Sequence, residues 1–226
     1  MIGHRAGGWP LAAFTAGSLA YILLMGLWPD TMNSLALVAV SVPLAVAVGF
    51  GLGVWGFHSA RVERFLTPLM DITQTIPAFA YLLPILILFG FGPVAAVIAT
   101  VIYAMPPMTR ITQLSLQRVP QDYLNVAKVL NLSEWKVITR ILFPAVLPYM
   151  LTGVRLAVGT AWLVIVAAEM LKADGGIGYF IWDAYNAGGD SSSSQIILAI
   201  LYVGLVGLAL DRLVAWAGRA IAKGGN

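Results

Sequence analysis

The chain of 226 residues contains no cysteine, and Lys, Arg, Asp and Glu together make up only 10% of it. The absence of cysteine excludes disulfides, thiolate metal sites and cysteine nucleophiles. The shortage of charge excludes a soluble globular surface, because soluble domains carry roughly 25% charged residues. Hydrophobic residues instead account for 60% of the sequence. We therefore predict an all-α integral membrane protein, built as one transmembrane domain over residues 1–226.

Sequence signatures of enzymes are also missing. The chain has no Gly-x-x-x-x-Gly-Lys-Ser/Thr phosphate loop, no Gly-x-Ser-x-Gly elbow and no His-Glu-x-x-His zinc pattern. We therefore expect no catalytic residue, no metal ligand and no bound cofactor in this chain. The lipid bilayer, and not nucleic acid, is its expected environment.

Uncharged stretches of about 20 residues, the length that crosses a bilayer, predict about six transmembrane helices. The first has tryptophans at both ends and lacks a small-residue cleavage pattern, so we interpret it as a retained span, not as a signal peptide. The third and fourth are expected on either side of the turn at Gly90 to Pro93, between about Asp71 and the Pro106-Pro107 pair. The other predicted spans are residues 9–28, 34–57, 149–171 and 195–216.

The placement of positive charge predicts the orientation, because loops kept in the cytoplasm are rich in Arg and Lys. With both termini inside, Lys172 is the one basic residue left in the predicted outer loops, whereas Asp30, Asp174, Asp183 and Asp190 gather there. We expect a multi-pass protein of the bacterial plasma membrane with both termini in the cytoplasm. The longest cytoplasmic loop would cover about residues 106–148.

Within that loop, residues 125–144 (NVAKVLNLSEWKVITRILFP) form a polar, helix-forming island in an otherwise apolar chain. The segment resembles the EAA signature of type I ABC importer permeases. Ala127 matches the second alanine, Ile141 the isoleucine and Pro144 the proline, at the spacing of that family. Four positions depart from the signature: Asn125 replaces the glutamate, Val126 the first alanine, Asn131 the glycine and Phe143 the leucine. We expect Asn131 to end a helix in the left-handed conformation that asparagine enters at modest cost.

Other stretches extend the resemblance to the same family. QTIPAFAYLLPILILFGFGP and YAMPPMTRIT are similar to permeases for quaternary amines such as glycine betaine. VPQDYLNVAKVL and VAAEMLKADGGIGYFIWDAYNAGG are similar to permeases for nitrate, bicarbonate or cyanate, which are related to those for taurine. The resemblance implies a type I ABC permease fold and import of a small polar solute, and it leaves the solute open between these classes.

The same resemblance implies partners. Two ATPase subunits would bind ATP and Mg²⁺, a second permease subunit would complete a homodimeric pathway, and an external binding protein would deliver the solute. A short cytoplasmic coupling helix would lie in a groove of the ATPase. The coupling residues would be Asn125, Val126, Ala127, Leu130, Asn131 and Leu132. The alternative is that this helix lies on the membrane surface through its apolar side.

Polar or charged residues inside the spans are candidates for the translocation pathway, since a charge at mid-bilayer costs roughly 3 kcal/mol on insertion scales. For Glu169 the alternative is an interfacial position, and for Arg155 it is snorkelling to the interface. For the rest it is helix capping and packing. The pathway candidates are Gln74, Thr75, Pro77, Arg155, Thr160, Trp162 and Glu169.

A second class of function is an ion-coupled secondary transporter or channel. Such a protein would favour buried acidic or histidine relays, but the histidines of this chain, His4 and His58, fall at the edges of predicted spans. Dependence of transport on ATP separates the two classes.

Overall fold

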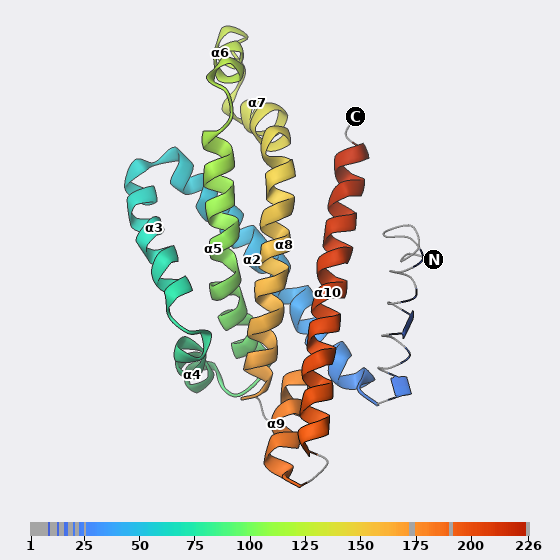
Figure 1. Ribbon diagram of the computed structural model, residues 1–226. Helices are drawn as coiled ribbons and strands as arrows, with labels where there is room; N and C mark the ends of the chain where they lie inside the picture. Colours follow the sequence, from blue (N-terminus) through green and yellow to red (C-terminus); the bar gives the residue numbers. More distant parts are fainter. Residues whose placement is uncertain are drawn as a thin grey trace.

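The computed structural model describes residues 26–171, 175–189 and 192–224, with Trp9, Ala13, Ala16, Gly17, Ala20, Leu23 and Leu24 from the amino-terminal segment. The predicted first span lies largely outside these residues. Within them, every regular element is a helix (Figure 1). The elements are α2 (Trp28–His58), α3 (Ala60–Thr75), α4 (Ala78–Phe89), α5 (Pro93–Gln117), α6 (Gln121–Val129), α7 (Glu134–Val137), a π-helical turn η1 (Ile138–Leu142), α8 (Phe143–Glu169), α9 (Ile177–Ala187) and α10 (Ser192–Gly224).

Small residues allow α2, α5 and α8 to pack closely at the centre of the molecule. Buried alanines from the three helices meet in one cluster: Ala45, Ala104, Ala157 and Ala161. On α2, a methyl group added at Gly49 would lie 2.6 Å from the Met105 carbonyl oxygen of α5, and one added at Gly53 would lie 2.5 Å from Thr112 Cβ. Small residues at such contacts are typical of membrane helices, whose association depends on close backbone packing.

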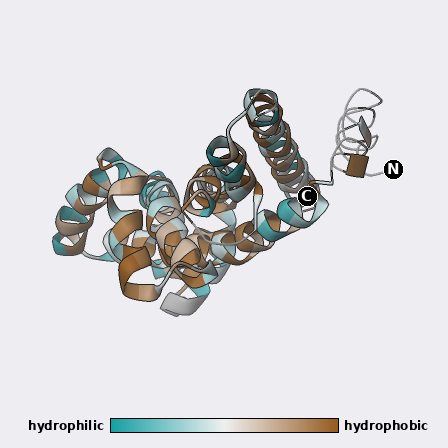
Figure 2. Ribbon diagram, turned by 90° about the horizontal axis from the view of Figure 1, so that it is seen from below, coloured by the Kyte–Doolittle hydropathy of each residue, from teal (hydrophilic) through white to brown (hydrophobic). Residues whose placement is uncertain are grey.

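Large apolar side chains face outward as well as inward. Ile87, Leu88 and Leu163 are 75%, 77% and 67% exposed. Seen from below the view of Figure 1, hydrophobic residues are spread around the helices instead of gathering only inside the bundle (Figure 2). This distribution suits a hydrocarbon environment, in which an outward-facing leucine is not exposed to water.

In the described part of the chain, four helices are long and apolar enough to cross a membrane: α2, α5, η1 with α8, and α10. The α3 and α4 pair, bent by 96° at Ile76 and Pro77, makes a fifth candidate. These spans confirm the predicted all-α polytopic membrane fold.

The predicted bounds of the third and fourth spans are wrong. The third candidate span starts at Ala60 instead of about Asp71, and its break lies before Pro77. The fourth does not end at the proline pair, because α5 continues through Pro106 and Pro107 to Gln117. Helix α5 packs against both α2 and α8. These contacts compensate for the loss of the backbone hydrogen bonds that prolines remove inside a helix.

The two ends of the bundle differ. The α6 and α7 segment and the carboxy-terminal end of α10 lie at one end, and α9 lies at the opposite end (Figure 1). We call these the α6 end and the α9 end.

Candidate coupling and translocation sites

Helix α6 ends in a hydrogen-bonded C-cap that depends on Asn131. The Leu132 N–H donates to the Ala127 carbonyl at 3.0 Å, and the Asn131 N–H donates to the Lys128 carbonyl at 3.0 Å. This pair of bonds is the Schellman pattern, which requires a left-handed residue at its centre. Asn131 has φ 49°, so the conformation predicted for this residue is confirmed.

The two sides of α6 have different neighbours. Ala127 is only 2% exposed. It lines a groove of about 430 Å³ together with Lys128 and Leu132, and the other walls of the groove include Phe57 and His58 at the carboxy-terminal end of α2. Of the predicted coupling residues, Ala127 therefore faces its own chain, whereas Asn125 is exposed.

Apolar side chains next to Ala127 on α6 are exposed. Four of them are 56% to 85% exposed: Tyr123, Val126, Val129 and Leu130. The helix lies beyond the ends of α5 and α8 (Figure 1). We call these four residues the α6 apolar face.

A continuous helical stretch leads from α7 into α8, and residues 130–133 connect α6 to it. The Glu134–Val137 helix passes through the π-helical turn Ile138–Leu142 directly into α8. Leu142 and Val146 pack there with Leu116 of α5 and with Val119, which follows α5. Packed side chains thus connect the helix that leads into α8 with the end of α5.

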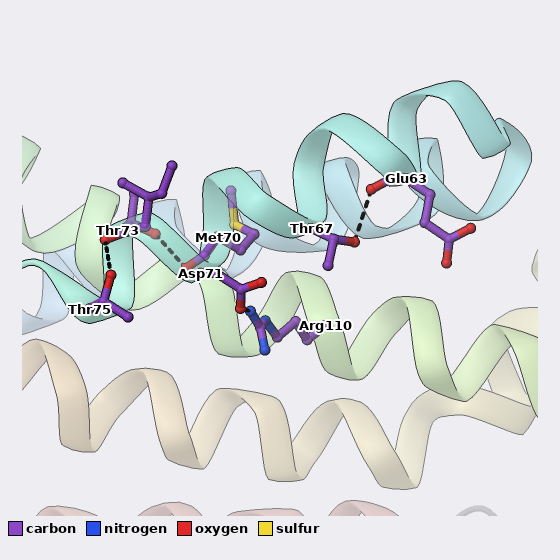
Figure 3. Close-up of polar contacts among 8 residues, drawn as sticks. Glu63, Thr67, Met70, Asp71, Thr73, Thr75 and Arg110 are labelled. Atoms are coloured by element: carbon purple, nitrogen blue, oxygen red, sulfur yellow. Dashed lines mark hydrogen bonds and ion pairs between the residues drawn. The ribbon is translucent and has the colours of Figure 1, made fainter.

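A polar groove lies between α3 and α5. On α3, Glu63, Thr67 and Asp71 recur every four residues and so lie on one face. Asp71 forms an ion pair with Arg110 of α5, and the two side chains, 55% and 43% exposed, point toward each other (Figure 3). Arg110 also lines a cavity of about 260 Å³ with Glu63 and Thr67.

The polar face of α3 continues toward the bend between α3 and α4. Gln74 follows Glu63 by eleven residues, or about three turns, and is therefore on the same face of α3. Thr75 is exposed and donates its hydroxyl to the Ile72 carbonyl at 3.1 Å, while Pro77 immediately precedes α4. The predicted residues Gln74, Thr75 and Pro77 thus lie at the break of the α3 and α4 pair.

The predicted pathway residues of α8 lie elsewhere. Arg155 forms an ion pair with Asp211 of α10. Trp162 is 3% exposed and donates its Nε1–H to the Val203 carbonyl of α10 at 3.0 Å. Thr160 donates its hydroxyl to the Leu156 carbonyl within α8 at 2.7 Å. Arg155 and Trp162 therefore join α8 to α10.

Glu169 lies fully buried at the α9 end. Its Oε2 accepts hydrogen bonds from Ser34 Oγ of α2 at 2.8 Å and from the Gly178 N–H of α9 at 3.1 Å. The Gly176 N–H donates in the same way to Asp30 Oδ1 at 3.0 Å. These bonds hold the start of α9 against α2 and α8.

Sequence reasoning missed two relationships. The Asp71 to Arg110 pair joins residues 39 positions apart, and the Ser34 to Glu169 bond joins residues 135 positions apart. The repeat of polar residues at Glu63, Thr67 and Asp71 was a readable signal of a polar helix face. No local signal predicts the Ser34 contact.

The family described as "Binding-protein-dependent transport system inner membrane component" matches residues 41–223. The chain is 50% identical to the nitrate import permease protein NrtB of Synechococcus elongatus over 197 residues, 87% of this chain and 71% of that protein. It is 37% identical to the bicarbonate transport system permease protein CmpB of Synechococcus elongatus over 225 residues, covering 95% and 80%. It is 33% identical to the glycine betaine/proline betaine permease protein ProW of Escherichia coli, covering 100% and 63%.

The fold also matches a solved structure, the inward-facing methionine ABC transporter MetNI. The TM-score is 0.66 at 19% identity, and the match covers 86% of this chain and 95% of that chain. Neither this match nor the relatives named above support the ion-coupled alternative. The chain belongs to the family of inner membrane components of binding-protein-dependent transport systems, and it is a permease subunit of an ABC importer.

Proposed function

We propose that this permease imports a small planar oxyanion of the nitrate type. The observation that carries the proposal is the 50% identity to a nitrate import permease over 87% of the chain. Nitrate and bicarbonate, the solutes named for NrtB and CmpB, are both planar and singly charged. The relatives named for betaine are less similar, at 33% identity.

The polar groove between α3 and α5 is the proposed lining of the pathway. Asp71 lies about 16 Å along α3 from its start, and Arg110 about 10 Å along α5 from its end, at a rise of 1.5 Å per residue. Both charges therefore lie at membrane depth, where exposed charged residues face water or a protein partner instead of lipid. We propose that a second copy of the chain faces this groove, with Gln74, Thr75 and Pro77 at the limit farther from the α6 end.

The α6 apolar face is the proposed docking surface for the ATPase subunits, which would hold ATP and Mg²⁺. An amphipathic helix seated in a groove is a common docking mode. The position of α6 beyond the bundle end favours docking over a position on the membrane surface. The α6 end is then cytoplasmic, and α9 faces the external binding protein that delivers the solute.

We assign Arg155, Trp162 and Glu169 to positioning, because each bonds to another helix of its own chain. Glu169 would fix the outer end of α8 against α2 and α9. Arg155 and Trp162 would fix α10 against α8.

Transport in proteoliposomes tests the proposed solute. The chain would be reconstituted with its ATPase and binding protein, and uptake of nitrate, bicarbonate, taurine and glycine betaine would be measured with and without ATP. We expect ATP-dependent uptake of nitrate, with little uptake of glycine betaine. A preference for taurine or betaine would contradict the oxyanion assignment. Uptake that follows an ion gradient without ATP would contradict the importer mechanism itself.

A further inference from the structure

A basic groove lies between α8 and α10, toward the α6 end. Its volume is about 410 Å³, and its lining includes Arg155 and Thr152 from α8 and Arg212 and Arg219 from α10. Leu151 and Val214 supply apolar parts of its walls. The groove does not include the polar residues between α3 and α5 or the α6 apolar face.

The positive charge in this groove is only partly compensated. Asp211 is engaged by Arg155, whose Nε and Nη2 donate to its two carboxylate oxygens, the second at 2.6 Å. In the described part of the chain, no carboxylate forms an ion pair with Arg212 or Arg219. Arg219 donates its Nε–H to the Ala215 carbonyl at 3.2 Å, which orients its guanidinium. Arg212 and Arg219 are two helical turns apart and therefore lie on one side of α10, about 10 Å apart along its axis.

From the charge pattern of α10 we infer that the groove lies at the level of lipid headgroups. Residues 192–210 of α10 are uncharged, and as a helix they span about 28 Å, which is close to the roughly 30 Å of a hydrocarbon core. Arg212 therefore lies at the edge of the hydrocarbon. Arg219, about 10 Å further along the axis, lies among the phosphates.

We propose that this groove binds the headgroup of an acidic phospholipid. The guanidinium groups of Arg212 and Arg219 would donate to phosphate oxygens, which they fit in geometry and charge. Leu151 and Val214 would contact the apolar part of the lipid next to the headgroup. Basic pockets between membrane helices on the cytoplasmic side are known to hold acidic headgroups. A zwitterionic headgroup fits less well, because it brings an amine next to two arginines.

This inference uses the proposed orientation but not the proposed solute. Lipid binding and nitrate uptake are separate measurements, so the failure of one is distinguishable from the failure of the other.

Native mass spectrometry of the full-length chain tests the proposal. The wild type, R212Q/R219Q and R61Q/R64Q would each be purified in one detergent and titrated with dioleoyl phosphatidylglycerol or dioleoyl phosphatidylcholine. Arg61 and Arg64 lie at the start of α3, so the second variant removes the same charge away from the groove. We expect phosphatidylglycerol binding to fall by about 30-fold in R212Q/R219Q, the factor expected for two basic residues near a membrane surface. R61Q/R64Q should retain wild-type binding.

Two further measurements distinguish lipid binding from binding of a soluble anion and control for misfolding of the variant. Inorganic phosphate at millimolar concentration should not displace phosphatidylglycerol, and R212K/R219K, which keeps the charge, should bind more lipid than R212Q/R219Q. Equal losses in R212Q/R219Q and R61Q/R64Q would overturn the proposal. Equal retention of the two lipids by the wild type would also overturn it. Full competition by inorganic phosphate would identify the groove as a soluble-anion site and reject the lipid.

Discussion

Ser34 on α2 donates a hydrogen bond from Oγ to Glu169 Oε2 of α8 at 2.8 Å, and the same hydroxyl accepts the Ile177 N–H at 3.1 Å. One serine thus joins two membrane helices to the first turn of α9. Glu169 itself is 0% exposed. A buried carboxylate that accepts a hydroxyl and a backbone N–H is a strong structural constraint, because both donors lose a partner if it is removed.

Replacing Glu169 tests this constraint. Leucine cannot accept the bonds from Ser34 and the Gly178 N–H, and an unsatisfied buried donor costs about 1–3 kcal/mol. We expect Glu169→Leu to lower the thermal midpoint in detergent by about 5–10 °C. Glu169→Gln, which still offers an acceptor oxygen, should lower it less. The control is Asp183→Asn on the exposed side of α9, which should match the wild type; a stable leucine variant would remove Glu169 from the positioning role.

The close packing around Gly178 gives a second prediction for the same contact. A methyl group there would lie 2.0 Å from the Val166 carbonyl oxygen and 2.8 Å from Glu169 Cβ. Because backbone cannot move aside cheaply, Gly178→Ala should sharply reduce the yield of folded protein. Gly204→Ala on α10 is the matched control, since nothing lies within 4 Å of a methyl group at that position. Comparison of the two by size-exclusion chromatography checks the prediction, and equal yields would contradict it.

The sequence predicted the membrane class and the helix end at Asn131, because both depend on local composition and backbone preference. It placed the end of a span at Pro106 and Pro107, since proline usually breaks a helix. In the structure α5 continues to Gln117, because contacts with α2 and α8 outweigh that preference. Tertiary packing of this kind has no local signature.

The candidate sites were predicted unevenly for the same reason. Gln74 and Thr75 were proposed because polar residues are rare in such a chain, and their place in the pathway stays a prediction. The inward position of Ala127 was not predicted, since it depends on how the α6 segment folds back toward Phe57 and His58. The bond partners of Arg155 and Glu169 lie on other helices, so their roles required the structure.

Buried and exposed positions of α6 should respond differently to a new charge. An aspartate at Val126 or Leu130 would lie on the α6 apolar face, so each variant should weaken copurification of the ATPase and leave the stability of the chain unchanged. Ala127→Asp would bury a charge against its own chain and should lower the thermal midpoint. Gln121→Asp adds the same charge at the start of α6, where the helix dipole favours it, and serves as the control. Normal ATPase retention in the Val126 and Leu130 variants would contradict the docking surface.

The absence of native cysteine makes the orientation easy to test. Asn186 on α9 and Ser133 between α6 and α7 are both exposed. Helix α9 lies at the opposite end of the bundle from α6 and α7 (Figure 1). A cysteine at Asn186 should react with an impermeant maleimide added to intact cells. One at Ser133 should react only after the membrane is opened. The reverse pattern would invert the proposed topology.

The ion pair of Asp71 and Arg110 provides the sharpest test of the pathway, because one single variant should lower uptake and the other should leave it unchanged. Arg110→Gln leaves the Asp71 carboxylate without its positive partner. At an effective dielectric constant of about 20, the repulsion energy between this carboxylate and an anion about 8 Å away is about 2 kcal/mol. We therefore expect nitrate uptake to fall by about tenfold or more. Asp71→Asn leaves Arg110 positive, so nitrate should enter the groove as readily as in the wild type.

Arg118→Gln is the matched control, since it removes an arginine next to the end of α5 without touching the pair. It should transport at the wild-type rate. A pair that only stabilises the fold would behave differently: both single variants would lose uptake equally, in parallel with a lower thermal midpoint. Uptake in proteoliposomes and thermal unfolding of the same preparations distinguish the cases, because repulsion of a passing anion depends on the sign of the remaining charge, whereas loss of a structural contact does not.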